Sequence, residues 1–189
     1  MSETAPPQTP EWTNDWACGH YTNWMKHLGK FIGQKALGLE IGSCEGRSSC
    51  FFVQNILTHP GSRLVCVDPW VMPGTEERFQ KNIDTLGCRE KMEIWKVFSD
   101  EFPISSPPIY DFVYVDGWHS AAAAMKDACR SWVALKKGGI LIFDDYMWHI
   151  NDLPRTDCPK LAIDSFLLIF EKELKVLHHG GQVIVEKKV

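Results

Sequence analysis

Short apolar runs alternate with longer segments of helical character along most of this chain. Strands that are apolar throughout are typical of a sheet covered on both faces. Alternation of such strands with helices predicts a parallel sheet with right-handed crossovers. The chain is therefore predicted to form an α/β three-layer sandwich. The predicted parallel strands lie at residues 36–41, 63–67, 92–97, 110–115 and 139–143.

Helix signals fill the gaps between these strands. An amphipathic period begins at Tyr21 and continues to Ile32. A turn is predicted at 136–139, and the last two runs flank His179-Gly180-Gly181 as a β-hairpin, which must add an antiparallel strand. We assign the pair His178-His179 to that turn, away from the carboxyl ends of the strands. Further helices are predicted at 46–59, 74–87, 119–135 and roughly 158–172.

Length and charge narrow the class of protein. A chain of 189 residues fits one domain, which we place at residues 19–189 behind a flexible N-terminal segment, 1–18. The net charge of −4 offers no basic surface to nucleic acid, and no apolar run approaches the roughly 20 residues that span a membrane. The N-terminus has no secretory signal, and the seven cysteines include no CxxC pair. These features predict a cytoplasmic protein without nucleic-acid or membrane partners.

Acidic and aromatic residues gather directly after the predicted strands. In an open parallel sheet, ligands bind beyond the carboxyl ends of the strands. A sheet that merely folds has no need of so many acids at one edge, so this edge is the predicted site. The residues concerned are Asp68, Trp70, Asp100, Asp116, Trp118, Asp144, Asp145 and Trp148.

The first of these loops runs from Glu40 to Ser48. Gly42 permits a tight turn, and Gly46 lets the backbone approach a ligand closely. The pattern is G-x-x-x-G, not the G-x-G-x-x-G of a dinucleotide site, which disfavours a pyrophosphate cradle and a nucleotide-dependent oxidoreductase. An acid before the first glycine suits an amine-bearing ligand. The alternatives are an ordinary strand–helix turn and a catalytic thiol at Cys44.

Taken together, these motifs resemble class I S-adenosylmethionine-dependent methyltransferases. The resemblance is carried by E-x-G-x-x-x-G-x-S at 40–48, the acid at Asp68, Phe98-Ser99-Asp100, VYVDGWH at 113–119 and LKKGGILIFDDY at 135–146. The pair VDGxH and FDDY is similar to small-molecule O-methyltransferases that include antibiotic-sugar enzymes, and more distantly to catechol O-methyltransferase. The resemblance implies a Rossmann-like fold with a seven-stranded sheet in the order 3-2-1-4-5-7-6.

The resemblance also implies which residues hold the cofactor. Glu40 would bind near its amino group or ribose, and Asp68 would hold the ribose hydroxyls, although a turn cap before Pro69 is the simpler alternative. Ser99 and Asp100 would read the adenine edge, and Trp118 would contact cofactor and acceptor. The full implied set is Glu40, Gly42, Ser43, Gly46, Ser48, Asp68, Ser99, Asp100, Asp116 and Trp118.

Three carboxylates after neighbouring strands predict a metal site. Asp116, Asp144 and Asp145 would repel one another and raise one another's pKa unless a cation lay between them. Oxygen ligands suit Mg²⁺, and the catechol enzymes bind Mg²⁺ at the matching positions, with an amide where this chain has Asp145. The alternatives are a turn at Asp116-Gly117 and helix caps at Asp144 or Asp145.

His119 is the predicted general base, acting beside Asp116. Methyl transfer needs an acceptor oxygen that has lost its proton or whose pKa has been lowered, and a neutral imidazole suits the first task. The matching residue of the catechol enzymes is a lysine base. A structural histidine at a helix start is the alternative role, and His149 is the reserve candidate for the base.

The resulting expectation is a metal-assisted O-methyltransferase acting on a small-molecule hydroxyl, in a sugar, a phenol or a natural product. A metal-independent methyltransferase with a histidine base and a non-catalytic cofactor-binding module are the alternatives. The sequence is compatible with a homo-oligomer. Trp12, Trp16 and Trp24 could form a lid, although we assign Trp24 to packing of the first helix against the sheet.

Overall fold

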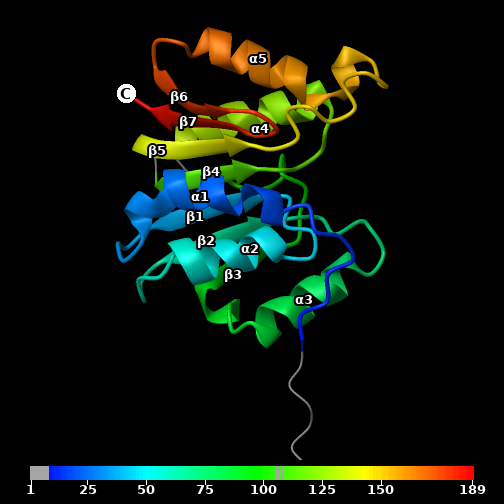
Figure 1. The fold of residues 1–189 in the computed structure, drawn as a ribbon, viewed down its shortest axis with the longest axis vertical. Coiled ribbons are helices and arrows are strands. Elements are labelled where there is room, and N and C mark those ends of the chain that lie inside the picture. The colour runs from blue at the N-terminus through cyan, green and yellow to red at the C-terminus, as the bar shows by residue number, and fades with distance from the viewer. Residues whose placement is uncertain (1–8, 105–106, 108) are drawn as a thin grey trace, which may run out of the picture.

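In a computed structural model, the chain forms one seven-stranded sheet between two layers of helices (Figure 1). The structure describes residues 9–104, 107 and 109–189. The strand order is β3-β2-β1-β4-β5-β7-β6, with β7 antiparallel to both neighbours, which confirms the predicted topology and hairpin. The strands are β1 (Leu37–Ile41), β2 (Arg63–Val67), β3 (Met92–Trp95), β4 (Tyr110–Val115), β5 (Leu135–Phe143), β6 (Leu174–His179) and β7 (Val183–Lys187).

Within the described residues, five α-helices cover the sheet, and most of them connect one strand to the next. They are α1 (Tyr21–Leu28), α2 (Arg47–Phe51), α3 (Thr75–Thr85), α4 (Ala121–Ala134) and α5 (Pro159–Ile169). Shorter 3₁₀ turns occur at Cys18–His20, Gly29–Phe31, Arg89–Lys91 and Arg155–Asp157, and α2 continues as a π turn, Phe52–Ile56. None of the helices in the described ranges is long and apolar enough to cross a membrane.

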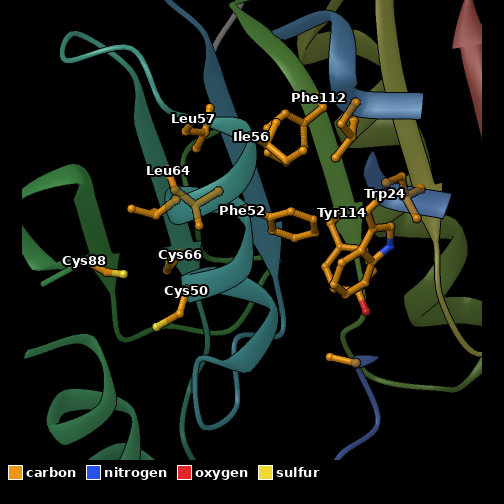
Figure 2. Packing of buried hydrophobic residues seen from close by; sticks show 14 of the residues in the cluster. Trp24, Cys50, Phe52, Ile56, Leu57, Leu64, Cys66, Cys88, Phe112 and Tyr114 are labelled. Atoms are coloured by element: carbon orange, nitrogen blue, oxygen red, sulfur yellow. The ribbon is translucent and has the colours of Figure 1, made fainter. Parts of the chain in front are cut away.

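Alternate residues of each strand enter opposite layers. Leu39 and Ile41 of β1 pack toward α4 and α5, whereas the residue between them, Glu40, points toward α2. On the α1 and α2 side, Trp24 packs in the core against Phe52 and Tyr114, with ring centroids 4.7 and 5.4 Å away (Figure 2). Trp24 is fully buried, as its assignment to packing predicted. Because successive side chains of a strand point to opposite faces, each apolar strand contributes to two hydrophobic cores, one on each side of the sheet.

Strand β5 begins earlier than predicted. Residues 136–139 do not form a separate turn, because β5 runs continuously from Leu135 to Phe143. Gly138 has φ +75°, and the β4–β5 register shifts between Tyr110 and Phe112. An irregularity within the strand, built at a glycine, therefore replaces the predicted turn.

The closing hairpin lies at the site edge of the sheet. Because β5 and β6 are both antiparallel to β7, β6 runs in the same direction as β5, and both strands end at the same edge of the sheet, on either side of the first residue of β7. The amide N–H of Tyr146 donates to the carbonyl of Gly181 over 3.0 Å, which ties the hairpin to the loop after β5. Our placement of His178-His179 away from the carboxyl ends was wrong.

Residues 11–17, the N-terminal strap, cross the loop after β1. The Glu11 amide donates to Asn82 of α3 over 2.6 Å, and Asn82 donates back to the Glu11 carbonyl over 2.8 Å. The amide and hydroxyl of Thr13 both donate to Glu45, over 2.8 and 2.7 Å. Part of the segment predicted to be flexible, 1–18, is therefore held by specific contacts, and residues 1–8 of it lie outside the described residues.

Candidate active site

A cleft of about 230 Å³ opens at the carboxyl edge of the sheet. A smaller cavity of about 20 Å³ adjoins it, and the two share Asp116 and Asp144. These two carboxylates therefore stand at the junction of the two spaces. The cleft is lined by Thr13, Asn14, Trp16, Ala17, Gly42, Ser43, Cys44, Glu45, Arg47, Ser48, Met72, Pro73, Thr75, Arg78, Tyr114, Asp116 and Asp144.

Gly42 fixes the course of the loop after β1. Its φ is +88°, its amide donates to the Val67 carbonyl over 2.9 Å, and a Cβ built on it would lie 1.8 Å from the Asp116 carbonyl oxygen. Only glycine fits such a close approach to the neighbouring strand. This contact brings the loop after β1 against the residue that follows β4.

Glu40 lies beneath this loop and is fully buried. Its carboxylate accepts hydrogen bonds from the hydroxyls of Ser43, Ser48 and Ser49, the first two over 2.8 and 2.6 Å. Burial raises its pKa, although the serine hydroxyls act in the opposite direction. Ser43 and Ser48 line the cleft, whereas Glu40 is not among the described residues that do so.

Asp68 braces the same loop through the backbone. One carboxylate oxygen accepts the Cys44 amide over 2.9 Å, and the other accepts the Trp70 amide over 2.6 Å. The Trp70 indole returns a hydrogen bond to the Cys44 carbonyl over 2.7 Å. The loop predicted to hold the cofactor is thus held in place by an acid that directly follows the neighbouring strand, β2.

Cys44 is half-buried on the cleft wall, with φ +46°. Burial raises the pKa of its thiol to about 11, with the charges of Asp68 and Glu45 acting in the same direction. A thiol of this kind is a poor nucleophile at neutral pH.

We expect Cys44 to react slowly with iodoacetamide. At pH 7.4 its thiolate fraction is roughly a hundredfold or more below that of a free cysteine, whose pKa is about 8.5. The rate should rise about tenfold per pH unit up to about pH 11. Peptide-resolved mass spectrometry of labelled protein, with N-acetylcysteine as the reference, would measure it. Rapid labelling of Cys44 at pH 7.4 would contradict this prediction and favour the alternative of a catalytic thiol.

The predicted adenine-reading residues follow β3. Ser99 is half-buried, its carbonyl accepts a hydrogen bond from Arg130 of α4, and Asp100 is exposed. Neither is among the described residues that line the cleft. Trp118 lines the smaller cavity and is 71% exposed. The structure thus places Trp118 at the mouth of the acidic region and leaves Ser99 and Asp100 further out.

Asp116 and Asp144 share one buried donor. The hydroxyl of Tyr114 lies 3.1 Å from an oxygen of Asp116 and is also within hydrogen-bond distance of Asp144. Burial, reinforced by the charges of Asp144 and Asp145, raises the pKa of Asp116 well above its usual value. Burial also raises the pKa of Asp144. Two carboxylates this close cost free energy when both are charged, unless a proton or a cation lies nearby.

His119 joins the acids from the start of α4. Its Nε2 lies 2.9 Å from Asp145 Oδ2, and its ring packs against Trp148 with centroids 4.4 Å apart. The ring of His149 packs on the same indole, also 4.4 Å away. Asp145 and His149 both have positive φ, an uncommon conformation for residues other than glycine.

A group of possible metal ligands forms at this point. One ligand atom from each of Asp116, His119 and Asp145 lies within 4.8 Å of the others. Two carboxylates and an imidazole fit a divalent cation. The predicted set contained Asp144 in place of His119. In the structure the Asp144 oxygens instead face Tyr114, Gln182 and the Asp145 amide.

Several residues at this edge were not identified from the sequence. From the sequence, Tyr114 is predicted only to be part of an apolar strand, and Gln182 only to be part of a hairpin. Glu45 carries no motif signal, yet it accepts from Thr13 and Arg78, and these hydrogen bonds hold its pKa below the usual value despite partial burial. Only the alternation of side chains along a strand could have indicated the position of Tyr114. Tyr114 lies two residues before Asp116, so the two side chains are expected on the same face of the sheet.

Comparison with known proteins finds a family that this chain matches. Residues 39–146 match a family model described as a methyltransferase domain. An uncharacterized protein of Acanthamoeba polyphaga mimivirus, R132, is 31% identical over 125 residues, which are 61% of this chain and 55% of that protein. The match thus spans about half the length of the viral relative.

Two solved structures share the fold. TomG, an O-methyltransferase of Streptomyces achromogenes involved in tomaymycin synthesis and solved with S-adenosylmethionine, superposes with a TM-score of 0.69 at 17% identity, covering 89% of this chain and 80% of TomG. An O-methyltransferase from Bacillus cereus, solved with S-adenosylhomocysteine, gives 0.69 at 14% identity, covering 93% and 84%.

Proposed function

Because this chain belongs to a methyltransferase domain family, we propose that it transfers a methyl group from S-adenosylmethionine to a hydroxyl oxygen of a small molecule. One observation carries the proposal. The cleft beside the loop after β1 meets a smaller acidic cavity at two shared carboxylates, Asp116 and Asp144. The second space, of about 20 Å³, has room for little more than a hydroxyl group, so a cofactor in the cleft and the reacting hydroxyl of an acceptor bound over the smaller cavity would meet at that junction.

The bound cofactor supplies an electrophilic methyl group on a sulfonium sulfur. The loop from Gly42 to Ser48, braced by Asp68, would hold it in the larger cleft. The acid groups at the junction would favour the positive sulfonium. In the absence of a metal ion, His119, paired with Asp145 over 2.9 Å, would accept the hydroxyl proton. Most of the rate enhancement would then come from alignment of oxygen, methyl carbon and sulfur.

We further propose that a divalent cation assists. Asp116, His119 and Asp145 would hold it, and it would lower the pKa of the acceptor hydroxyl. Mg²⁺ is the cation predicted from the sequence, whereas the imidazole nitrogen also suits Mn²⁺ and other transition metals. Without a cation, His119 paired with Asp145 provides the general base of the metal-independent alternative.

We expect Asp145→Asn to weaken Mn²⁺ binding by about tenfold or more, because it replaces an anionic carboxylate ligand with a neutral amide oxygen. Titration of the protein followed by electron paramagnetic resonance of free Mn²⁺ would measure this. Asp152→Asn is the matched control, because Asp152 is exposed and pairs only with His149 among the ion pairs of the described residues. If the wild type binds no Mn²⁺, with or without cofactor, the metal-independent alternative is favoured.

Calorimetric titration with S-adenosylhomocysteine tests the cofactor site, and transfer of a radiolabelled methyl group to a panel of hydroxyl acceptors tests the reaction. Binding without transfer to any acceptor would favour the non-catalytic module. No binding by folded wild-type protein would overturn the proposal.

We also propose a cellular location, a class of acceptor and an assembly state for the protein. We propose a cytoplasmic location, because all seven cysteines are free thiols, as a reducing compartment requires. A small-molecule acceptor, rather than nucleic acid or membrane, fits the acidic edge of the sheet. Assembly as a homo-oligomer is compatible with these features.

A further inference from the structure

We infer that Gln182, together with Tyr114, is a positioning residue that fixes the Asp144 carboxylate at the junction of the two cavities. The inference rests on the proposed function, because it assigns Asp144 the task of facing the cofactor sulfonium. Gln182 lies outside the motifs identified from the sequence, and Tyr114 lies within VYVDGWH but has no role assigned to it there.

A chain of hydrogen bonds leads to Asp144 from three elements. The Trp24 indole of α1 donates to the Gln182 side-chain oxygen over 2.9 Å. The Gln182 side-chain nitrogen then donates to Asp144 Oδ2 over 3.0 Å, and the Tyr114 hydroxyl reaches the same oxygen. Because the indole is only a donor, it fixes which end of the amide faces Asp144.

The other Asp144 oxygen is also occupied. Oδ1 accepts the Asp145 amide over 2.8 Å and lies 4.0 Å from Nε2 of His20. Asp144 therefore has donors on both oxygens, as a fixed anion requires. Trp24 and Gln182 are fully buried and Tyr114 is 2% exposed, so water cannot easily replace these donors. Figure 2 shows Trp24 and Tyr114 side by side in the core on this side of the sheet.

This arrangement separates the roles of the three acids after β4 and β5. Asp116 and Asp145 retain oxygens that can meet His119, whereas Asp144 is held by core donors and lines both cavities. A fixed negative charge at the junction would favour a sulfonium over the uncharged thioether of the product. The structure thus assigns this network to discrimination between S-adenosylmethionine and S-adenosylhomocysteine.

The test compares affinities for the two cofactor forms by calorimetry. We expect Asp144→Asn to lower the ratio of S-adenosylmethionine to S-adenosylhomocysteine affinity by roughly tenfold. Gln182→Met and Tyr114→Phe should lower it several-fold in the same direction. In the Asp144→Asn background, Gln182→Met should not change the ratio further, because the Gln182 side-chain nitrogen acts through that carboxylate. Two independent variants are used because one could fail to fold.

Ser62→Ala is the matched control. Ser62 is fully buried, accepts the Ala36 amide over 3.0 Å and donates to the Gln34 carbonyl over 3.1 Å, at the opposite edge of the sheet. This variant should lower thermal stability without changing the affinity ratio. Equal loss of both ligands in Gln182→Met and Tyr114→Phe, or a shift from Gln182→Met that persists in the Asp144→Asn background, would overturn the inference. A wild type that binds neither cofactor form would instead overturn the proposed function.

Discussion

Replacing Gly42 with alanine is expected to lower S-adenosylhomocysteine affinity by at least about a hundredfold. The alanine Cβ would lie 1.8 Å from the Asp116 carbonyl oxygen, so either the loop after β1 or the residue after β4 must move. A positive φ adds about 1–2 kcal/mol for a residue with a Cβ. Both displaced segments line the cleft, so the damage falls on the proposed cofactor site.

Gly33→Ala separates the two causes. Gly33 also has positive φ, +74°, but an added Cβ would meet no atom within 4 Å. The control should therefore lose only the conformational term, about 1–2 kcal/mol, and should bind S-adenosylhomocysteine like the wild type. Calorimetry and thermal unfolding measure the two effects. Near-normal binding by folded Gly42→Ala protein would show that the close approach of the two loops is not needed for cofactor binding.

Asp68→Ala is the second substitution with a large expected effect. It leaves the amides of Cys44 and Trp70 without their carboxylate acceptor. Hydrogen bonds to a charged group are worth roughly 1.5–3 kcal/mol each, so we expect a stability loss of about 3 kcal/mol, seen as a lower urea midpoint. Because the family resemblance also predicts that Asp68 holds the ribose hydroxyls, we expect cofactor binding to fall by about a hundredfold or to be lost.

Asp111→Ala is the matched control for Asp68. Asp111 also accepts a backbone amide, from Leu37 over 2.7 Å, and a second hydrogen bond from Lys136, over 2.8 Å, but at the amino end of β4. It should lose comparable stability and keep its affinity for S-adenosylhomocysteine. If Asp68→Ala loses stability but keeps full affinity for S-adenosylhomocysteine, Asp68 only stabilises the loop. That outcome would favour the structural alternative, a turn cap before Pro69.

The cleft also depends on the N-terminal strap. The Glu45 carboxylate, in the loop after β1, accepts a hydrogen bond from the Thr13 amide of the strap. The Asn82 side chain of α3 donates to the backbone carbonyls of both Glu11 and Glu45. Thr13, Asn14 and Trp16 consequently form one wall of the cleft. The sequence shows three tryptophans in this region but no pattern that separates them. Trp24 is fully buried, whereas Trp16 is 71% exposed at the cleft.

The sequence by itself determined the layers, the strand order through its resemblance to a known family, and the edge at which the acids meet. Apolar runs and helical periods are local properties, so a sheet covered on both faces can be recognised without coordinates. The tertiary structure decided which side chains meet at that edge. His119 rather than Asp144 groups with Asp116 and Asp145, because donors from Tyr114 and Gln182 hold Asp144.

The hairpin is the clearest case of information absent from the local sequence. Nothing in residues 174–187 indicates that β6 lies outside β7 and runs parallel to β5, which brings the hairpin to the site. Gln182 meets Asp144 across 38 positions of sequence and Trp24 across 158. Such contacts depend on strand direction and side-chain orientation together, and only the folded chain fixes both.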